Sequence, residues 1–141
     1  MRDTDVSVLR MFGRAIVLSC PWCGGRRTFI RRWLGKYPRC RTCGIQWRRE
    51  EGFELGAVAV NTVVTFAALT VAMTIAFIRT SPDIPVLPLV VAFVGVAVLL
   101  PIVLYPFSYT IWLAFDLAAN RPSQKELTQA AQWVVESGSA T

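Results

Sequence analysis

Residues 20–24 read CPWCG, and residues 40–44 read CRTCG. These two stretches contain all four cysteines of the 141-residue chain, and sixteen residues separate one pair from the other. Two Cys-x2-Cys pairs at a separation of about 15–20 residues are typical of metal-binding ribbons. The glycine after each pair permits a tight turn in which backbone N–H groups point at thiolate sulfur. The sequence therefore predicts one set of four metal ligands: Cys20, Cys23, Cys40 and Cys43.

Zinc is the first expectation for this ligand set, because zinc with four thiolates forms a closed, tetrahedral and redox-silent site. Iron is the alternative, since paired CxxCG turns also resemble rubredoxin, a one-iron electron carrier, and thiolates alone do not choose between the two metals. The N-terminal 54 residues bury too little apolar surface to be stable without such help. We therefore expect a small β zinc-ribbon-like domain over residues 20–50.

Two long apolar runs follow the cysteine-rich region. Residues 55–78 carry no charge, and as a helix these 24 residues would rise about 36 Å, enough to cross a hydrocarbon core about 30 Å thick. The second uncharged run is longer than one span needs, so Pro101 and Pro106 are expected to kink it or end its membrane-centred part. The fold class predicted is a hairpin of two transmembrane helices, residues 55–78 and 86–115, joined by a short external turn at residues 79–85.

The two ends of the chain are expected to be amphipathic. In the basic segment of residues 1–19, apolar side chains recur near helical spacing at Val6, Leu9, Phe12 and Ile16, which fits either a helix on a membrane surface or a partly ordered tail. Near the C-terminus, Ser123 and Glu126 have the spacing of a capping box. We therefore predict a short amphipathic helix over residues 123–137, on the surface of the protein.

The positive charge is concentrated in front of the spans. Twelve of the fifteen Lys and Arg residues lie in residues 1–54, and short basic flanks beside membrane spans mark the cytoplasmic side. Both termini are therefore expected in the cytoplasm. We interpret the basic patch as facing the bilayer surface or a partner, with a membrane-tethered nucleic-acid binder as the alternative. The patch comprises Arg26, Arg27, Arg31 and Arg32.

Small and weakly polar residues recur at spacings of three and four in the first span, at Asn61, Thr65, Ala68, Ala72 and Ala76. Such a face allows close helix packing, either on the chain's own second span through Ala92 and Gly95 or on a foreign membrane protein. The chain has no histidine, and no ionisable residue lies deep in either span. These absences argue against a proton path, haem ligation by histidine and histidine-based catalysis. We expect neither enzymatic activity nor a small-molecule substrate.

The motifs CPWCGG, CRTCGI, EEGFELGA and YPFSYTIW together resemble the bacterial membrane-protein family called domain of unknown function 983, particularly its actinobacterial branch. The resemblance covers roughly residues 12–120 and implies a place in the bacterial inner (plasma) membrane. Some members are similar in setting to cytochrome c oxidase assembly genes, which implies a part in building or accompanying a respiratory complex. We therefore expect a non-enzymatic accessory or assembly subunit of an inner-membrane complex, docking with partner subunits and the lipid bilayer. An iron electron carrier remains the alternative.

Overall fold

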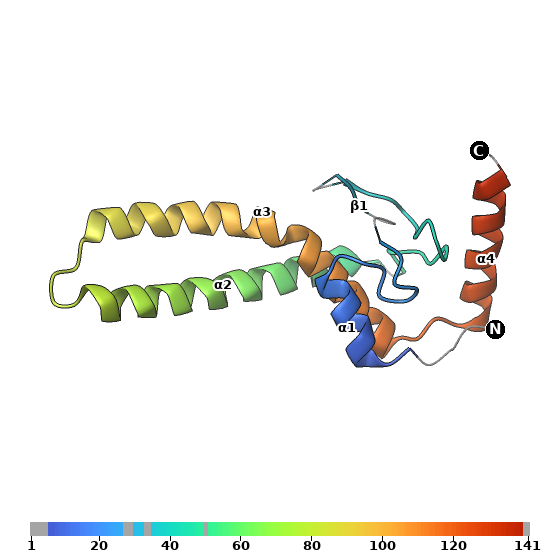
Figure 1. Ribbon diagram of the computed structural model, residues 1–141, viewed down its shortest axis with the longest axis horizontal. Coiled ribbons are helices and arrows are strands. Elements are labelled where there is room, and N and C mark those ends of the chain that lie inside the picture. The colour runs from blue at the N-terminus through green and yellow to red at the C-terminus, as the bar shows by residue number, and fades with distance from the viewer. Residues whose placement is uncertain (1–5, 27–29, 33–34, 50, 140–141) are drawn as a thin grey trace.

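The computed structural model describes residues 6–26, 30–32, 35–49 and 51–139. Figure 1 shows a long helical hairpin with the remaining elements and both chain termini gathered at its open end. We call residues 6–49 the head. In chain order the elements are α1 (Val8–Ile16), β1 (Ile30–Arg32), β2 (Gly35–Lys36), α2 (Phe53–Thr80), α3 (Val86–Ala119) and α4 (Gln124–Ser139).

The hairpin consists of α2 and α3, which have 28 and 34 residues. Both helices are long and apolar enough to cross a membrane. Each extends beyond the predicted span, because helical hydrogen bonding continues past the last uncharged residue. The connecting turn is correspondingly shorter than expected and covers residues 81–85. The side chains that point away from the partner helix are mostly exposed, as expected of helices that face lipid or another protein.

The second long helix does not end at its prolines. Pro101 and Pro106 both lie inside α3, and Figure 1 shows the helix bending in its last third. Proline removes one backbone donor and its ring presses on the carbonyl four residues earlier, so a bend is the expected result. The part of α3 after the bend still contacts the beginning of α2, where the Phe53 and Tyr109 rings meet, and it also packs against α1.

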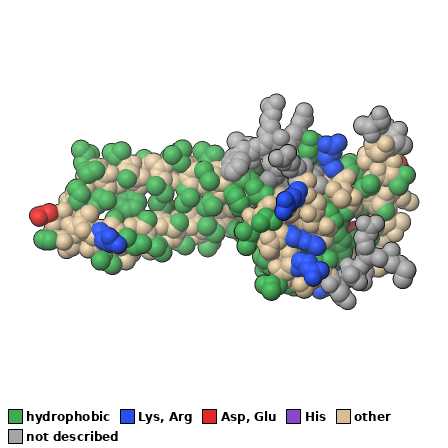
Figure 2. Space-filling view, viewed as in Figure 1, with side chains coloured by type: hydrophobic (Ala, Val, Ile, Leu, Met, Phe, Trp, Pro, Cys, Tyr) green, Lys and Arg blue, Asp and Glu red, His purple; other side chains and the backbone are tan. Residues whose placement is uncertain are grey.

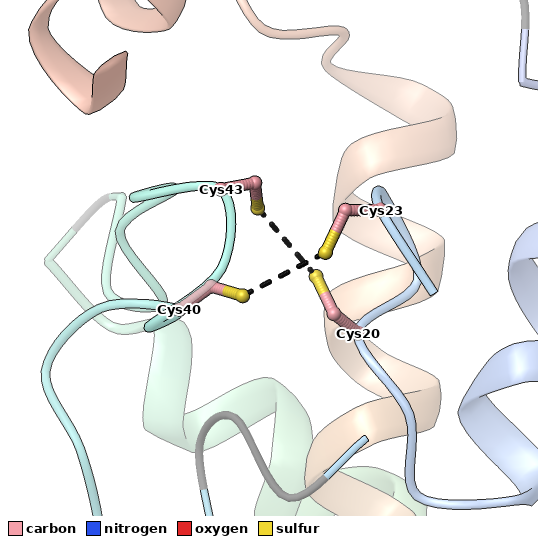
Figure 3. A group of neighbouring side chains, drawn as sticks. All are labelled: Cys20, Cys23, Cys40 and Cys43. Carbon is pink, nitrogen blue, oxygen red and sulfur yellow. Dashed lines mark hydrogen bonds between the residues drawn. The ribbon is translucent and has the colours of Figure 1, made fainter. Parts of the chain in front are cut away.

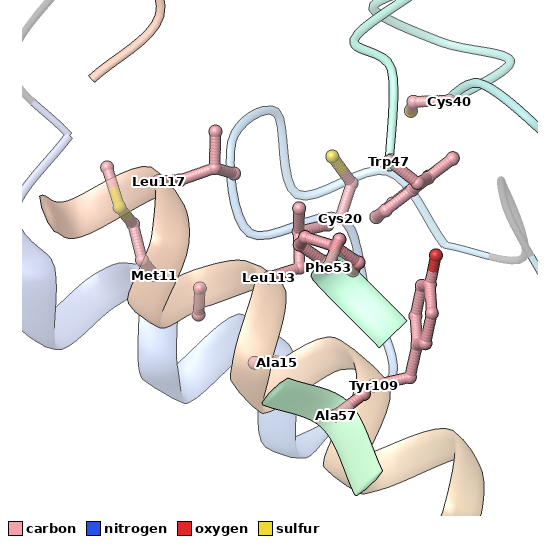
Figure 4. Packing of buried hydrophobic residues seen from close by; sticks show 11 residues of the cluster. Met11, Ala15, Cys20, Cys40, Trp47, Phe53, Ala57, Tyr109, Leu113 and Leu117 are labelled. Carbon is pink, nitrogen blue, oxygen red and sulfur yellow. The ribbon is translucent and has the colours of Figure 1, made fainter. Parts of the chain in front are cut away.

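The hydrophobic core lies where the head meets this last part of α3 (Figure 4). From α1 it takes Met11 and Ala15, both fully buried, and the Thr110 hydroxyl of α3 donates a hydrogen bond to the Ala15 carbonyl at 3.0 Å. Residues 8–16 are therefore a helix packed on α3, and the alternative of a partly ordered tail is wrong for them. The cluster comprises Met11, Ala15, Cys20, Cys40, Trp47, Phe53, Ala57, Tyr109, Leu113, Ala114 and Leu117.

Contact between the two long helices follows only part of the predicted small-residue face. Asn61 Nδ2 donates a hydrogen bond to the Pro101 carbonyl at 3.0 Å, Thr65 is buried, and Ala76 is half-buried. Ala68 and Ala72 are instead exposed. The face turned toward α3 continues at steps of four residues, from 61 to 65 to 69, and so it passes through Leu69, which is half-buried.

The predicted partner positions on α3 also differ from those observed. Ala92 is exposed, and a Cβ placed on Gly95 would meet nothing within 4 Å. A close approach instead occurs at the root of the hairpin, where a Cβ on Gly56 would lie 1.9 Å from the Trp112 ring. Glycine there allows an aromatic ring to lie against the α2 backbone.

Candidate metal centre

Each cysteine pair lies in a tight turn, which we call the first knuckle (residues 20–25) and the second knuckle (residues 40–45). Gly24 and Gly44 have φ values of +77° and +73°, the left-handed region that favours glycine. The Gly24 amide donates to the Cys20 carbonyl, and the Gly44 amide donates to the Cys40 carbonyl, both at 2.8 Å. The two knuckles therefore repeat one conformation.

Little regular β-structure surrounds the knuckles. Strands β1 and β2 form one short antiparallel pair, and each knuckle is flanked by an isolated bridge, Ser19 with Arg26 and Arg39 with Gln46. The described part of the head is thus organised by two turns that face each other, and the ribbon-type sheet expected from the cysteine spacing is reduced to these short pairings.

The four sulfur atoms converge on one point (Figure 3). Cys20 Sγ lies 3.9 Å from Cys43 Sγ, Cys23 Sγ lies 3.8 Å from Cys40 Sγ, and all four sulfurs lie within 4.8 Å of one another. These distances exceed the disulfide bond length of about 2.05 Å. They match the separation of about 3.8 Å between sulfurs bound tetrahedrally to zinc at about 2.3 Å. The group can therefore hold one metal ion, and thiolates in this arrangement suit either zinc or iron.

The pKa values of the Cys20 and Cys23 thiols are shifted in opposite directions. Cys20 and Cys40 are buried, whereas Cys23 and Cys43 are partly exposed. Hydrogen bonding to neighbouring sulfurs, first that of Cys23, and burial raise the pKa of Cys20. Hydrogen bonding to Cys20 lowers the pKa of Cys23 to about 7. Crowded thiols resist ionising together, and a divalent cation would offset two of the four thiolate charges and so favour their ionisation.

The first knuckle is covered by α1. Arg14 Nη1 donates hydrogen bonds to the carbonyls of Pro21 at 3.2 Å and Trp22 at 2.7 Å. A Cβ placed on Gly24 would lie 3.1 Å from Arg14 Nε, so the guanidinium lies directly against the turn. Because α1 is also packed on α3, this arginine connects the first cysteine pair to the hairpin.

The second knuckle is covered by α4. A Cβ placed on Gly44 would lie 2.0 Å from the Ala130 carbonyl oxygen, and Ala130 is buried. The predicted capping box is confirmed, because the Ser123 amide donates to Glu126 at 2.7 Å and the Glu126 amide donates to Ser123 Oγ at 3.3 Å. The helix lies on the surface, as predicted, with most of its described residues exposed, and the side that carries Ala130 packs on the second knuckle.

Arg49 connects the head, α3 and α4. Its guanidinium forms ion pairs with Asp116 at 3.2 Å and Glu126 at 3.1 Å, and it also donates to the Asn120 carbonyl. The side chains of Arg49 and Asp116 are each only 11% exposed. Partial burial alone would raise the pKa of Glu126, but hydrogen bonds from the Ser123 amide and Arg49 lower it overall. Sequence reasoning missed Arg49, because its partners lie 67 and 77 residues away.

A second polar contact lies on the side of the head nearest the hairpin. Lys36 Nζ lies 3.4 Å from Glu54 Oε1 and 3.8 Å from the centre of the Tyr109 ring. Arg48 also pairs with Glu54, at 2.8 Å. Below them Phe53 and Tyr109 meet edge to face, with ring centres 5.4 Å apart. Through Lys36, these contacts attach β2 to the beginning of α2 and to Tyr109 in the last part of α3.

The predicted basic patch is only partly described. Arg26 is exposed beside the first knuckle. Arg27 lies outside the described residues, and the side chains of Arg31 and Arg32 in β1 are not described either. Figure 2 shows Lys and Arg side chains over the head, with few along the hairpin.

Comparison with known families adds one finding. The model of a family described as "Protein of unknown function (DUF983)" matches residues 30–116. This range contains the second cysteine pair and both long helices up to Asp116, whereas the first pair, α1 and α4 lie outside it. The comparison with curated proteins and the comparison with solved structures each found no match.

Proposed function

Since the chain belongs to the DUF983 family, whose description names no activity, we propose its function from the geometry of the head and hairpin. The protein is a non-enzymatic accessory or assembly subunit of a complex in the bacterial inner membrane. Zinc held by the four cysteines stiffens a docking head at the cytoplasmic face, and α2 and α3 pack against helices of the partner subunits.

The observation that carries this proposal is the convergence of four sulfurs within 4.8 Å in a head attached to a long apolar hairpin. Four thiolates complete the coordination of zinc and leave no position for water or substrate. Binding energy at such a site acts as folding energy. The metal would thus hold together two knuckles that contribute little regular structure, and it would present a rigid surface beside the membrane.

The placement of the head in the cytoplasm is supported by the distribution of charge. Twelve of fifteen Lys and Arg residues lie in residues 1–54, and the described ones among them belong to the head end, where both termini also lie (Figure 1). The turn at residues 81–85 has one acidic residue and no basic one. Short basic flanks stay on the cytoplasmic side during insertion, so the turn would lie on the opposite side.

Metal analysis tests the role of the head. We expect one zinc ion for each purified chain, and loss of both zinc and cellular abundance when any one of the four cysteines is changed to Ser. Thr42→Ser is the matched control, because Thr42 lies inside the second knuckle and is exposed but supplies no ligand. A folded, fully abundant chain without metal would contradict the structural role.

Co-purification tests the role of the whole protein. We expect that a tagged chain, extracted in mild detergent, brings down subunits of one membrane complex, and the family resemblance makes a respiratory oxidase the first complex to look for. The Cys40→Ser variant, lacking the metal, is expected to lose these partners. Recovery of the chain alone would remove the support for an accessory subunit.

Electron transfer by iron is a second candidate. The Gly25 amide donates a hydrogen bond to Cys23 Sγ at 3.3 Å, and hydrogen bonds to thiolate sulfur raise the potential of iron sites. Cys23 and Cys43 are also partly exposed, which would let an electron leave at the head surface. A visible absorption spectrum of the purified protein separates the two, because iron on four thiolates is coloured and zinc is not.

A further inference from the structure

Exposed apolar side chains on the described residues are concentrated at one place outside the two long helices. Six large hydrophobic residues of the described chain are exposed outside α2 and α3, and four of the six belong to α1 or to the residue that follows it. Leu9 is 85% exposed, and Ile16 and Val17 are 60% and 62% exposed. The fourth is Val8, whereas Ile84 and Val135 lie singly elsewhere.

The exposed and the buried apolar residues occupy different sides of α1. Met11 and Ala15 are fully buried in the core beside α3. Leu9 and Ile16 are seven residues apart, about two turns, and therefore share another side of the helix. Val17 is the C-cap residue next to Ile16 and is exposed as well. We call Leu9, Ile16 and Val17 the outer ridge of α1.

The depth of α1 follows from its hydrogen bond to α3. Thr110 binds the Ala15 carbonyl and lies 24 residues after Val86, the first residue of α3. Pro106 lies 20 residues after Val86, which at 1.5 Å per residue is about 30 Å along the helix, the thickness of the hydrocarbon core. The helix is bent in this part, so Thr110, four residues further on, adds at most about 6 Å of depth. With the turn at residues 81–85 at one boundary of the hydrocarbon, α1 therefore lies at the other boundary, beside the headgroup layer. Figure 1 shows α1 at the root of the hairpin, beside the last part of α3, with its C-terminal end toward the long parallel part of the hairpin.

Charge identifies the kind of surface that would cover the ridge. Residues 6–49 contain eleven Lys and Arg residues and no acidic residue. Arg10 beside the ridge and Arg26 on the first knuckle are both exposed. Helices that lie in the plane of a membrane combine an apolar face, inserted about 5–10 Å into the headgroup boundary, with basic side chains that attract anionic lipid. Figure 2 shows hydrophobic side chains and Lys and Arg side chains together on this part of the head.

We propose that the outer ridge of α1 inserts into the headgroup layer of an anionic bilayer and holds the metal-binding head against the membrane. This inference rests on the proposed function only for the placement of the hairpin in a membrane. Ile16 and Val17 insert most deeply, because the C-terminal end of α1 lies toward the long parallel part of the hairpin, and Leu9 inserts less. The buried face of the same helix keeps α1 attached to α3, so the ridge has a fixed depth.

The test uses the full-length, metal-loaded chain in lipid nanodiscs. Trifluoromethylphenylalanine replaces Ile16, Leu9 or Val135 in separate samples, and a lipid with a nitroxide on its headgroup broadens fluorine signals near the membrane surface. Val135 is the matched control, because it is equally apolar and exposed but lies on α4. We expect several-fold greater broadening at Ile16 than at Val135, with Leu9 between them, and a larger effect when phosphatidylglycerol is added to phosphatidylcholine.

Two results would overturn the proposal. One is broadening at Ile16 no greater than at Val135 in both lipid mixtures. The other is an Ile16 signal that ignores the nitroxide but shifts with the ratio of chain to lipid, because a second copy would then cover the ridge. Failure of the proposed function is a separate outcome, in which the Ile16 signal is broadened as expected but no partner subunit co-purifies.

A serine substitution gives a second test. Ile16→Ser should reduce the broadening of a fluorine label at Leu9, whereas Val135→Ser should leave that broadening unchanged, and both variants should keep their zinc content.

Discussion

Replacing Gly44 by Ala tests whether α4 is seated on the second knuckle. The new Cβ would lie 2.0 Å from the Ala130 carbonyl oxygen and 2.7 Å from its carbon, and both are backbone atoms of a helix. Gly24 is the matched control, because it has the same left-handed conformation in the first knuckle. There the nearest atom to a new Cβ is the Arg14 guanidinium, at 3.1 Å, and a flexible side chain can move away.

The expected magnitudes separate the two variants. A residue with a Cβ in the left-handed region costs about 1–2 kcal/mol, so Gly24→Ala and Gly44→Ala should both weaken the stability of the metal-loaded head by about that amount. This corresponds to a factor of about 5–30 in the folding equilibrium. The overlap at Gly44 adds a steric cost that α4 can relieve only by moving away from the knuckle. Undocking of α4 is therefore expected in Gly44→Ala alone.

Hydrogen exchange of backbone amides in the detergent-solubilised chain measures this difference. Competition with a chromogenic chelator measures metal affinity in the same samples. We expect a similar loss of metal affinity in both variants, but faster exchange across α4 (residues 124–139) only in Gly44→Ala. Equal protection of α4 in the two variants, or faster exchange of α4 in Gly24→Ala, would refute the packing of Ala130 on Gly44.

Three further predictions concern the polar contacts. Arg49→Gln should destabilise the folded protein by about 1–3 kcal/mol in chemical denaturation, because it leaves the largely covered Asp116 without its cation. Arg48→Gln, which breaks an exposed pair, should cost about 0–1 kcal/mol, and equal losses in the two variants would contradict this. Since the pKa of Glu126 is lowered in the folded protein, its contribution to α4 docking should be complete above the ordinary carboxyl pKa and decline as the pH falls through the lowered value. Exchange rates of α4 against pH should show this decline, and Glu126→Gln should abolish it. Asn61→Leu removes a hydrogen bond between the long helices. It should lower the free energy of unfolding by about 1 kcal/mol in a steric-trap assay in lipid. An unchanged free energy of unfolding would show that this bond does not stabilise the hairpin.

Features with a local signature could be predicted from the sequence. The Cys-x2-Cys-Gly pairs predicted which sulfurs meet, since each knuckle is closed by hydrogen bonds within six residues. The uncharged runs predicted two long helices, because span length depends only on rise per residue and bilayer thickness. The Ser123 and Glu126 spacing predicted a helix start because both capping bonds lie within one turn.

Features that depend on how helices are oriented could not be predicted. The small-residue face included Ala68 and Ala72 because any residues at spacings of three and four form a stripe on a helix. Which stripe meets α3 depends on how α2 is rotated about its axis, and the structure has Leu69 at that position instead. The same limit applies to α1, whose apolar residues form one pattern in sequence but divide between the core and an exposed ridge.

By itself, the sequence determined the membership of the family, the four cysteines that could hold a metal and the two long apolar helices, because each depends on a local pattern in the chain. Only the tertiary structure showed that the terminal helices cover the two knuckles, through Arg14 on Gly24 and Ala130 on Gly44. It also showed that Arg49 joins the head to α3 and α4. These contacts link residues far apart in sequence, and they form only once rigid helices have taken their places around the core.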